Sequence, residues 1–292
     1  MFKFGFLGDE EDKGIFLSKD VDGKNLSINW IPASEVEVSR SQIENNHEAN
    51  DYAENSIFPG CKLKLIRSDK ALHVLKEENC ANIIEAETQH SDLIPAKYEG
   101  GLKIWESSYD LGQYILEKNI ELQGKLVLDL GCGAGVIGLV ALLRNSRVHF
   151  QDYNVEVIET VTIPNVLLNV DDRESVLKRC KFFSGDWESF RKLNNSNVDN
   201  SYSKYDMIFT SETIYNPDNH QKLYEVFKDR LKQDGVGFIA GKSYYFGVGG
   251  GMRQFQSLIE EDGVFDVEVA WKTGEGLQRE ILKITRKQEL FT

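Results

Sequence analysis

The chain has 292 residues, 41% of them hydrophobic, which is enough to bury a large core in one or two domains. Its formal net charge of −13 at pH 7 disfavours binding to the phosphate backbone of nucleic acids, so we expect no direct sequence-specific nucleic-acid binding and instead a basic protein partner. No run of about 20 apolar residues is present, so we expect no membrane span.

The beginning of the chain does not have the pattern of a signal or transit peptide, and we therefore expect the protein in the cytoplasm and nucleus. The four cysteines are scattered without a CxxC pair, and the five histidines are dispersed. This spacing predicts neither a metal site nor a disulfide framework.

Residues 1–56 are acidic, rich in Asn and Ser and weakly periodic, and we interpret them as a partly flexible N-terminal extension, with 34–55 as a linker. Phe2, Phe4 and Phe6 alternate as one face of a short strand would, either to dock on the body of the protein or to recruit a partner. The main domain is expected over 57–292. It begins with a strand over 61–66, a helix over 71–78 and a strand over 82–86.

The central motif is a strand, a glycine loop and a helix over residues 126–143. The spacing of Gly133, Gly135 and Gly138 fits a dinucleotide fold, but alone it is a weak signal. Asp129 followed by Gly131 and Gly133 fits the S-adenosyl-L-methionine turn of class I methyltransferases better. A carboxylate there suits the α-ammonium group of that cofactor and would repel a pyrophosphate. A turn that binds nothing is the remaining alternative.

The segments on either side of this motif supply further candidates. Trp105 stands before a helix that Ser107 or Ser108 would cap, and its ring suits either cation–π contact with a sulfonium or core packing. Asp152 ends the second strand, expected over 147–150, where an acid accepts hydrogen bonds from ribose hydroxyls in both nucleotide classes. A helix over 155–169 should kink or break at Pro164.

The third and fourth strands, over 180–184 and 205–210, end in the remaining candidate residues. Asp186 after Gly185 suits the adenine amino group or the N-cap of the next helix, and Trp187 suits stacking on the base. Glu212, Tyr215 and Asn216 follow the fourth strand, where the carboxyl end faces the ligand crevice, so they are the predicted contacts of the methyl acceptor.

The C-terminal third continues the alternation of helices and strands. We expect a helix over 223–231, a turn at 233–235, a strand over 236–240, a glycine-rich lid or phosphate cradle over 241–251, a helix over 255–261 and a hairpin over 265–271 and 278–284. The whole pattern predicts an α/β, class I (Rossmann-like, seven-stranded) S-adenosylmethionine-dependent methyltransferase.

Six stretches together resemble the histidine protein methyltransferases: 98–106, 128–133, 149–154, 182–187, 210–217 and 245–251. The resemblance implies methylation of one imidazole nitrogen of a histidine in a large-subunit ribosomal protein, with S-adenosyl-L-homocysteine as product and an influence on ribosome biogenesis and translation. It also implies cofactor contacts at Ile104, Trp105, Glu106, Ser107, Ser108, Gly131, Asp152, Tyr153, Asn154, Gly185, Asp186, Trp187 and Ser211.

The expected chemistry needs no strong base, because an unperturbed histidine with a pKa of about 6.5 is mostly neutral in the cell. A carboxylate or amide that accepts from the non-reacting N–H would orient the other nitrogen. Glu212 and Asn216 are predicted for this role, with Tyr215 as a wall. We expect a monomer acting on a basic ribosomal protein, free or within a pre-ribosomal particle. The alternatives are a lysine protein methyltransferase of the same fold and a non-catalytic ribosomal-protein chaperone.

Overall fold

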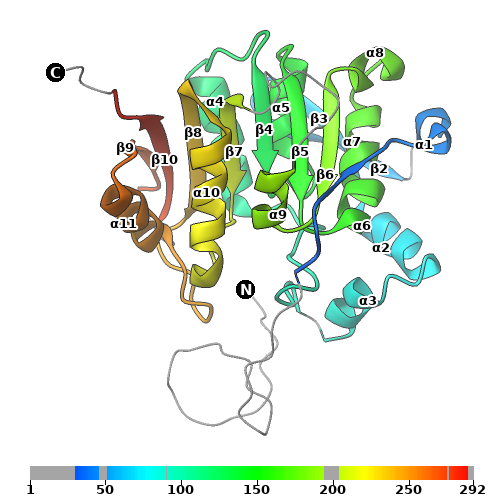
Figure 1. Cartoon of the computed structure of the whole chain (residues 1–292). Coiled ribbons are helices and arrows are strands. Elements are labelled where there is room, and N and C mark those ends of the chain that lie inside the picture. The colour runs from blue at the N-terminus through cyan, green and yellow to red at the C-terminus, as the bar shows by residue number, and fades with distance from the viewer. Residues whose placement is uncertain (1–29, 46–50, 90, 194–203, 275, 289–292) are drawn as a thin grey trace, which may run out of the picture.

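The computed structural model describes residues 30–45, 51–89, 91–193, 204–274 and 276–288, and within them the chain forms one large twisted sheet between two layers of helices (Figure 1). The sheet has eight strands in the order β1-β6-β5-β4-β7-β8-β10-β9. The strands β4 to β8 are parallel, whereas β1 and β10 pair antiparallel with their neighbours. Their bounds are β1 (Ser34–Val36), β4 (Leu126–Leu130), β5 (Arg147–Asp152), β6 (Cys180–Ser184), β7 (Tyr205–Ser211), β8 (Leu231–Lys242), β9 (Phe265–Lys272) and β10 (Arg279–Arg286).

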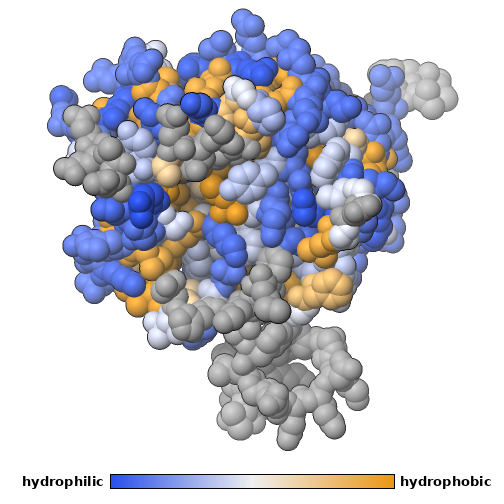
Figure 2. Space-filling model, turned by 180° about the vertical axis from the view of Figure 1, so that it is seen from behind, coloured by the Kyte–Doolittle hydropathy of each residue, from blue (hydrophilic) through white to orange (hydrophobic). Residues whose placement is uncertain are grey.

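Each face of the sheet buries its own apolar cluster. On one face pack α4 (Glu106–Glu117), α5 (Val136–Leu143) and α7 (Ile163–Leu168), covered in part by a hairpin of β2 (Tyr52–Phe58) and β3 (Cys61–Ile66). On the other pack α9 (Trp187–Lys192), α10 (His220–Arg230) and α11 (Met252–Asp262). Seen from behind, mostly hydrophilic residues cover the molecule, with hydrophobic residues in patches between them (Figure 2). Covering both faces is what a mainly parallel sheet requires.

The N-terminal part is more ordered than its composition indicates. The predicted linker over 34–55 contains β1, which pairs with β6, as well as α1 (Arg40–Glu44) and the start of β2, so its prediction as a linker was wrong. The strand β2 also crosses the expected boundary at residues 56 and 57. Pairing with a distant strand edge stabilises β1, and local periodicity does not reveal such an edge. Phe2, Phe4 and Phe6 lie outside the described residues.

Several local predictions are confirmed and two are wrong. The strand over 61–66, the helix α2 (Ser68–Glu77) and the β9–β10 hairpin are present. The strand expected over 82–86 is instead the helix α3 (Ala81–Thr88), because Ile83 and Ala86, three residues apart, bury one helical face against Leu75 and Tyr98. The turn expected at 233–235 lies within β8, where the register against β7 shifts.

The chain does not break at Pro164 but stays helical, and the helix type changes just before the proline. The chain passes from α6 (Val155–Val157) through a π-helical turn (Ile158–Thr162) into α7, in which Pro164 stands in the first turn. Proline lacks the N–H of a regular helical bond, and a π turn accommodates that loss. The short helix α8 (Arg173–Leu177) then leads into β6.

The strand β4 is buried over its whole length at the centre of the sheet. It lies parallel to β5 on one side and β7 on the other, and the helices that follow β4 and β7 pack on opposite faces. This is the switch point at which open α/β sheets bind ligands, beyond the carboxyl ends of the strands. Phe150 of β5 leaves no room for a β-carbon at Gly138, so α5 packs closely on the sheet.

Among the described residues, no helix is long and apolar enough to cross a bilayer. In the same part of the chain, no group of three or more His, Cys, Asp or Glu side chains is arranged to hold a metal ion.

Candidate active site

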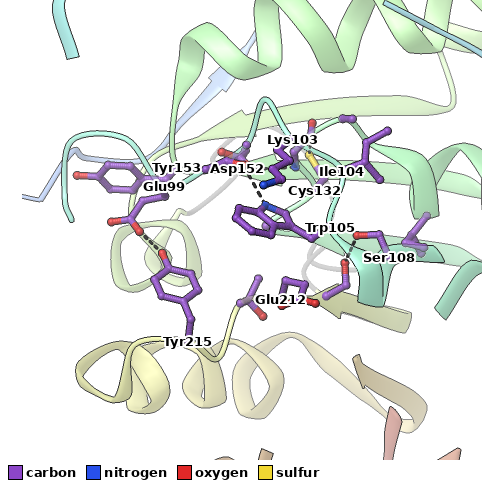
Figure 3. Close-up of a pocket in the computed structure, with 18 of the residues that line it drawn as sticks. Glu99, Lys103, Ile104, Trp105, Ser108, Cys132, Asp152, Tyr153, Glu212 and Tyr215 are labelled. Atoms are coloured by element: carbon purple, nitrogen blue, oxygen red, sulfur yellow. Dashed lines mark hydrogen bonds between the residues drawn. The ribbon is translucent and has the colours of Figure 1, made fainter. Parts of the chain in front are cut away.

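A pocket lies beyond the carboxyl ends of β4, β5, β6 and β7, and it encloses about 820 Å³ when the part open to solvent is counted. Most of the predicted site residues come together here (Figure 3). They are Ile104, Trp105, Ser108, Gly131, Gly133, Asp152, Tyr153, Gly185, Asp186, Trp187, Ser211, Glu212 and Tyr215.

Five predicted residues do not line the pocket. Asp129 lies beneath the glycine loop, where its Oδ2 accepts from the Gly138 N–H at 2.7 Å, so it supports the loop instead of facing a ligand. Burial raises the pKa of Asp129 to about 7. The side chain of Asn154 bonds the backbone of the segment before α4, accepting from the Glu99 N–H at 3.1 Å and donating to the Lys97 carbonyl at 2.7 Å.

The other three were misplaced because their side-chain directions are set by helix starts. Asn216 does not face the acceptor, since its Oδ1 accepts from the Asp218 N–H at 3.0 Å and caps the short 3₁₀ helix Pro217–Asn219. Glu106 pairs with Lys242 at 3.2 Å. Ser107 points inward to Glu212, and Trp105, not Ser107 or Ser108, is the N-cap residue of α4.

At the middle of the pocket, Asp152 joins the end of β5 to the glycine loop. Its Oδ2 accepts from the Gly133 N–H at 2.8 Å and its Oδ1 from the Asn154 N–H at 3.2 Å. Burial raises the pKa of Asp152 to about 6 despite these backbone bonds. Each carboxylate oxygen keeps a further lone pair for a ligand.

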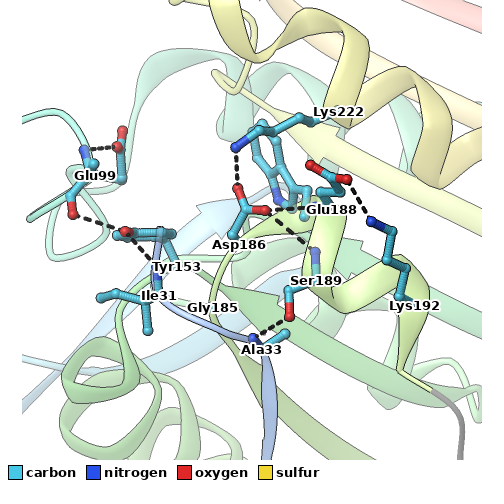
Figure 4. Close-up of polar contacts among 12 residues, drawn as sticks. Ile31, Ala33, Glu99, Tyr153, Gly185, Asp186, Glu188, Ser189, Lys192 and Lys222 are labelled. Carbon is cyan, nitrogen blue, oxygen red and sulfur yellow. Dashed lines mark hydrogen bonds and ion pairs between the residues drawn. The ribbon is translucent and has the colours of Figure 1, made fainter. Parts of the chain in front are cut away.

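At the β6 end, the N-cap prediction for Asp186 is confirmed. Its Oδ2 accepts from the N–H groups of Glu188 and Ser189 at 3.0 and 3.4 Å, and its Oδ1 pairs with Lys222 at 2.7 Å (Figure 4). Trp187 is oriented by its indole N–H, which donates to Gln151 Oε1 at 2.9 Å. Contact of Asp186 or Trp187 with adenine stays a prediction.

Trp30 is a pocket residue that the sequence analysis missed. The chain at Trp30–Ala33 folds across the ends of β5 and β6: the Asp186 N–H donates to the Ile31 carbonyl at 2.8 Å, and the Ala33 N–H to Ser189 Oγ at 2.8 Å (Figure 4). The Lys222 Nζ lies 3.4 Å from the centroid of the Trp30 ring. Nothing in the composition of this acidic segment indicates that one of its aromatic residues closes the pocket.

At the β7 end, Glu212 is buried, and its backbone has a φ of 58°, which is rare for a residue other than glycine. Its Oε1 accepts from the Ser107 N–H at 3.2 Å and from Ser107 Oγ at 2.5 Å. Its Oε2 is buried and accepts no hydrogen bond of regular geometry from the described residues, although the hydroxyl of the buried Tyr245 faces the same carboxylate. A buried carboxylate oxygen without a well-placed donor is costly, and such groups gather at functional sites.

Two further pocket residues, Glu99 and Asn219, were not predicted. The Tyr215 hydroxyl donates to Glu99, and the two side chains point toward one another across the pocket (Figure 3). Burial, with the adjacent Glu99, raises the pKa of Tyr215 well above its usual value. Asn219 lines the same end, and its Oδ1 is buried without a partner among the described residues. The separation of Asn216 and Asn219 by one helical turn explains why the sequence pointed to the wrong amide.

Comparison with known proteins shows the family of this chain. A family model described as "Lysine methyltransferase" matches residues 95–245. The chain is 39% identical to the mouse "Histidine protein methyltransferase 1 homolog" over 92% of its own length and 79% of that protein. The rat and Dictyostelium discoideum proteins of the same name are 44% and 43% identical over 68% of this chain, which spans 60% and 61% of their lengths. The chain belongs to the histidine protein methyltransferase family.

The chain is therefore a methyltransferase, and its methyl donor is S-adenosylmethionine. The predicted class I α/β fold is confirmed. A solved magnesium protoporphyrin IX methyltransferase from Synechocystis with bound S-adenosylhomocysteine aligns over 62% of this chain and 83% of its own, with a TM-score of 0.46 and 14% identity, values too low to say anything about function.

The pocket residues fit the cofactor. Gly131 has a φ of 67°, and a β-carbon there would lie 2.5 Å from Thr213 Cγ2, so the loop after β4 keeps a space that a side chain would fill. Asp152 offers the acceptor that ribose hydroxyls require. Gly131 and Ser211 lie at the ends of adjacent strands, β4 and β7, between the Asp152 end of the pocket and Glu212.

We expect the affinity for S-adenosylhomocysteine to fall as the pH drops below about 6. Ribose hydroxyls bond the charged form of Asp152 more strongly, so the ligand favours the ionised carboxylate whose pKa burial has raised to about 6. Protonation then opposes binding by up to about tenfold per pH unit. Calorimetry between pH 5 and 8 measures this slope.

Asp152→Asn should bind S-adenosylhomocysteine more weakly than wild type, and its affinity should not depend on pH in this range, because an amide does not titrate. Asp129→Asn is the matched control: its carboxyl is also buried and titrates nearby, with a pKa of about 7, but it does not line the pocket. If the pH dependence of binding persisted in Asp152→Asn and vanished in Asp129→Asn, the titrating group would be Asp129, and the prediction for Asp152 would be wrong.

Proposed function

We propose that this histidine protein methyltransferase modifies one imidazole nitrogen of a histidine in a basic large-subunit ribosomal protein, acting as a monomer in the cytoplasm and nucleus and so influencing ribosome biogenesis and translation. The net charge of −13 supports a basic substrate, because opposite charges speed the encounter of two proteins. The observation that supports the histidine chemistry best is the buried Oε2 of Glu212, which accepts no hydrogen bond of regular geometry from the described residues.

In this proposal Glu212 selects the reactive form of the substrate. Its Oε2 accepts the N–H of one imidazole nitrogen, which leaves the lone pair on the other nitrogen directed at the methyl group. Ser107 holds Oε1 with two hydrogen bonds, so the carboxylate is fixed before the substrate arrives. Such fixed alignment contributes up to about 7–11 kcal/mol to lowering a barrier.

The cofactor supplies an electrophilic methyl group on a positively charged sulfur. Transfer of that methyl group to the ring nitrogen would leave positive charge on the imidazole ring. Glu212 stabilises that charge through the hydrogen bond it already holds. The proton of the non-reacting nitrogen then leaves to Glu212 or to water, and the methylated ring becomes neutral.

Tyr215 and Glu99 form the opposite wall in this proposal. Because the Tyr215 hydroxyl is committed to Glu99 and its pKa is raised, it stays protonated and presents its ring edge to the substrate. The role predicted for Asn216 is withdrawn, since its amide caps the 3₁₀ helix. The side-chain amide at this end of the pocket is instead that of Asn219, whose Oδ1 is buried and has no partner among the described residues.

The test is methyl transfer to large-subunit proteins from cells that lack the enzyme. With isotope-labelled S-adenosylmethionine we expect label in one protein, on a histidine when the peptides are sequenced by mass spectrometry. Proteins extracted from the subunit and intact pre-ribosomal particles are assayed side by side to show which form is the substrate. Label on lysine would favour the lysine methyltransferase alternative. Tight binding of a ribosomal protein without any label would favour the chaperone.

A further inference from the structure

Two aromatic side chains in contact with each other stand exposed on the loop that follows β8. Tyr244 is 47% and Phe246 73% exposed, and their rings meet edge to face with centroids 5.0 Å apart. Single exposed apolar residues are common on protein surfaces, but contiguous ones mark interaction sites. The loop lies at the end of the sheet to which the strands β4, β5 and β7 point (Figure 1).

The loop is held in place against the acceptor end of the pocket. The Gly250 N–H donates to the Tyr215 carbonyl at 2.9 Å, and the Tyr245 N–H donates to the Gly250 carbonyl at 2.9 Å. A β-carbon at Gly250 would collide with the Tyr215 carbonyl, so only glycine permits this approach. The backbone of the loop is therefore anchored to the residue that walls the substrate site.

Tyr245, in the same loop, points into the protein and contacts Tyr215. It is buried, its ring centroid lies 6.5 Å from that of Tyr215, and burial together with the nearby Glu212 carboxylate raises its pKa well above the usual value. Its neighbours in the chain, Tyr244 and Phe246, face outward while Tyr245 faces Glu212. The exposed pair thus flanks a residue that contacts the acceptor end of the pocket.

We propose that Tyr244 and Phe246 bind the substrate polypeptide by contacting an apolar side chain a few residues from the target histidine. The inference rests on the proposed function, and it adds how the substrate is recognised. An enzyme that modifies a histidine within a protein must have the flanking polypeptide across the mouth of its pocket, and the loop that carries this pair is hydrogen-bonded to Tyr215, which lines that pocket. Attraction between the acidic enzyme and a basic substrate weakens with salt, whereas aromatic contact does not.

The test compares the double variant Tyr244→Ala/Phe246→Ala with wild type in methyl transfer to large-subunit proteins from cells that lack the enzyme. We expect KM for the protein acceptor to rise about tenfold, with kcat within about twofold. The affinity for S-adenosylhomocysteine should not change. Both side chains are exposed, so their removal leaves the core intact. Leu143→Ala, 44% exposed at the end of α5, is the matched control and should behave as wild type.

The outcomes separate this inference from the proposed substrate. If wild type labels no large-subunit protein, the proposed substrate is wrong, and the same comparison is made on total protein from those cells. Equal KM values for wild type and double variant on whichever acceptor is labelled would overturn the docking role. A loss of cofactor affinity, or a wild-type dimer that the double variant abolishes, would also overturn it, because the pair would then support the fold or join two copies.

Discussion

Glu212→Gln should lower kcat by about 10²–10³-fold while the affinity for S-adenosylhomocysteine stays within about twofold of wild type. Glutamine has the shape of glutamate, so its carbonyl oxygen can still accept from Ser107 at the start of α4. What it loses is the negative charge at the position of Oε2, where the amide would place a donor against the imidazole N–H. Single-turnover methyl transfer together with calorimetry separates the two effects.

Two control variants divide the role of Glu212 into its parts. Ser107→Ala removes one of the two hydrogen bonds to Oε1 but keeps the charge, so it should cost about 1 kcal/mol of stability and lower turnover less than Glu212→Gln does. Asn216→Ala removes only a helix cap outside the pocket and should also keep turnover. Normal turnover in Glu212→Gln would remove Glu212 from the mechanism proposed above. So would a fall in kcat in Asn216→Ala that is as large as the fall in Glu212→Gln.

Gly131→Arg should abolish detectable binding of S-adenosylhomocysteine. The side chain would begin 2.5 Å from Thr213 Cγ2 and extend into the space that the loop after β4 leaves for the cofactor. The left-handed backbone at this position, with a φ of 67°, adds about 1–2 kcal/mol of strain for any residue with a β-carbon. Calorimetry and the thermal shift caused by the ligand both measure the loss.

Gly124→Arg is the matched control for this experiment. Gly124 has a φ of 71°, so its backbone strain is similar, but no atom lies within 4 Å of the β-carbon it would gain. We expect Gly124→Arg to lose a similar amount of stability and to bind the ligand normally. If both variants lost binding equally, backbone strain and not occupation of the pocket would be the cause.

The cofactor half of the site was accessible from sequence because its signals are local. A buried strand, a glycine turn and a helix follow one another over residues 126–143, and acids stand directly after the next two strands, at Asp152 and Asp186. Parallel strands bring their carboxyl ends to one edge of the sheet, so residues at those ends lie close together whatever the conformation of the loops. The resemblance to histidine protein methyltransferases rested on the same contiguous motifs.

The acceptor half depended on side-chain direction, which a loop sequence does not specify. Asn216 and Asn219 are chemically alike, and only the start of the 3₁₀ helix turns one outward and the other into the pocket. Asp129 has the right charge for an ammonium group, yet it is used beneath the loop by the Gly138 N–H. Glu99 became a site residue only through its contact with Tyr215.

The sequence by itself determined the α/β alternation, the glycine loop and the acids at the strand ends, because these follow from periodicity and from conformations that few residues adopt. Only the tertiary structure decided that β1 joins the sheet, that Trp30 closes the pocket and that one oxygen of Glu212 accepts no hydrogen bond of regular geometry from the described residues. Each of these depends on contacts between segments far apart in the chain. Their free energy comes from pairing and burial in the folded state, which no local pattern records.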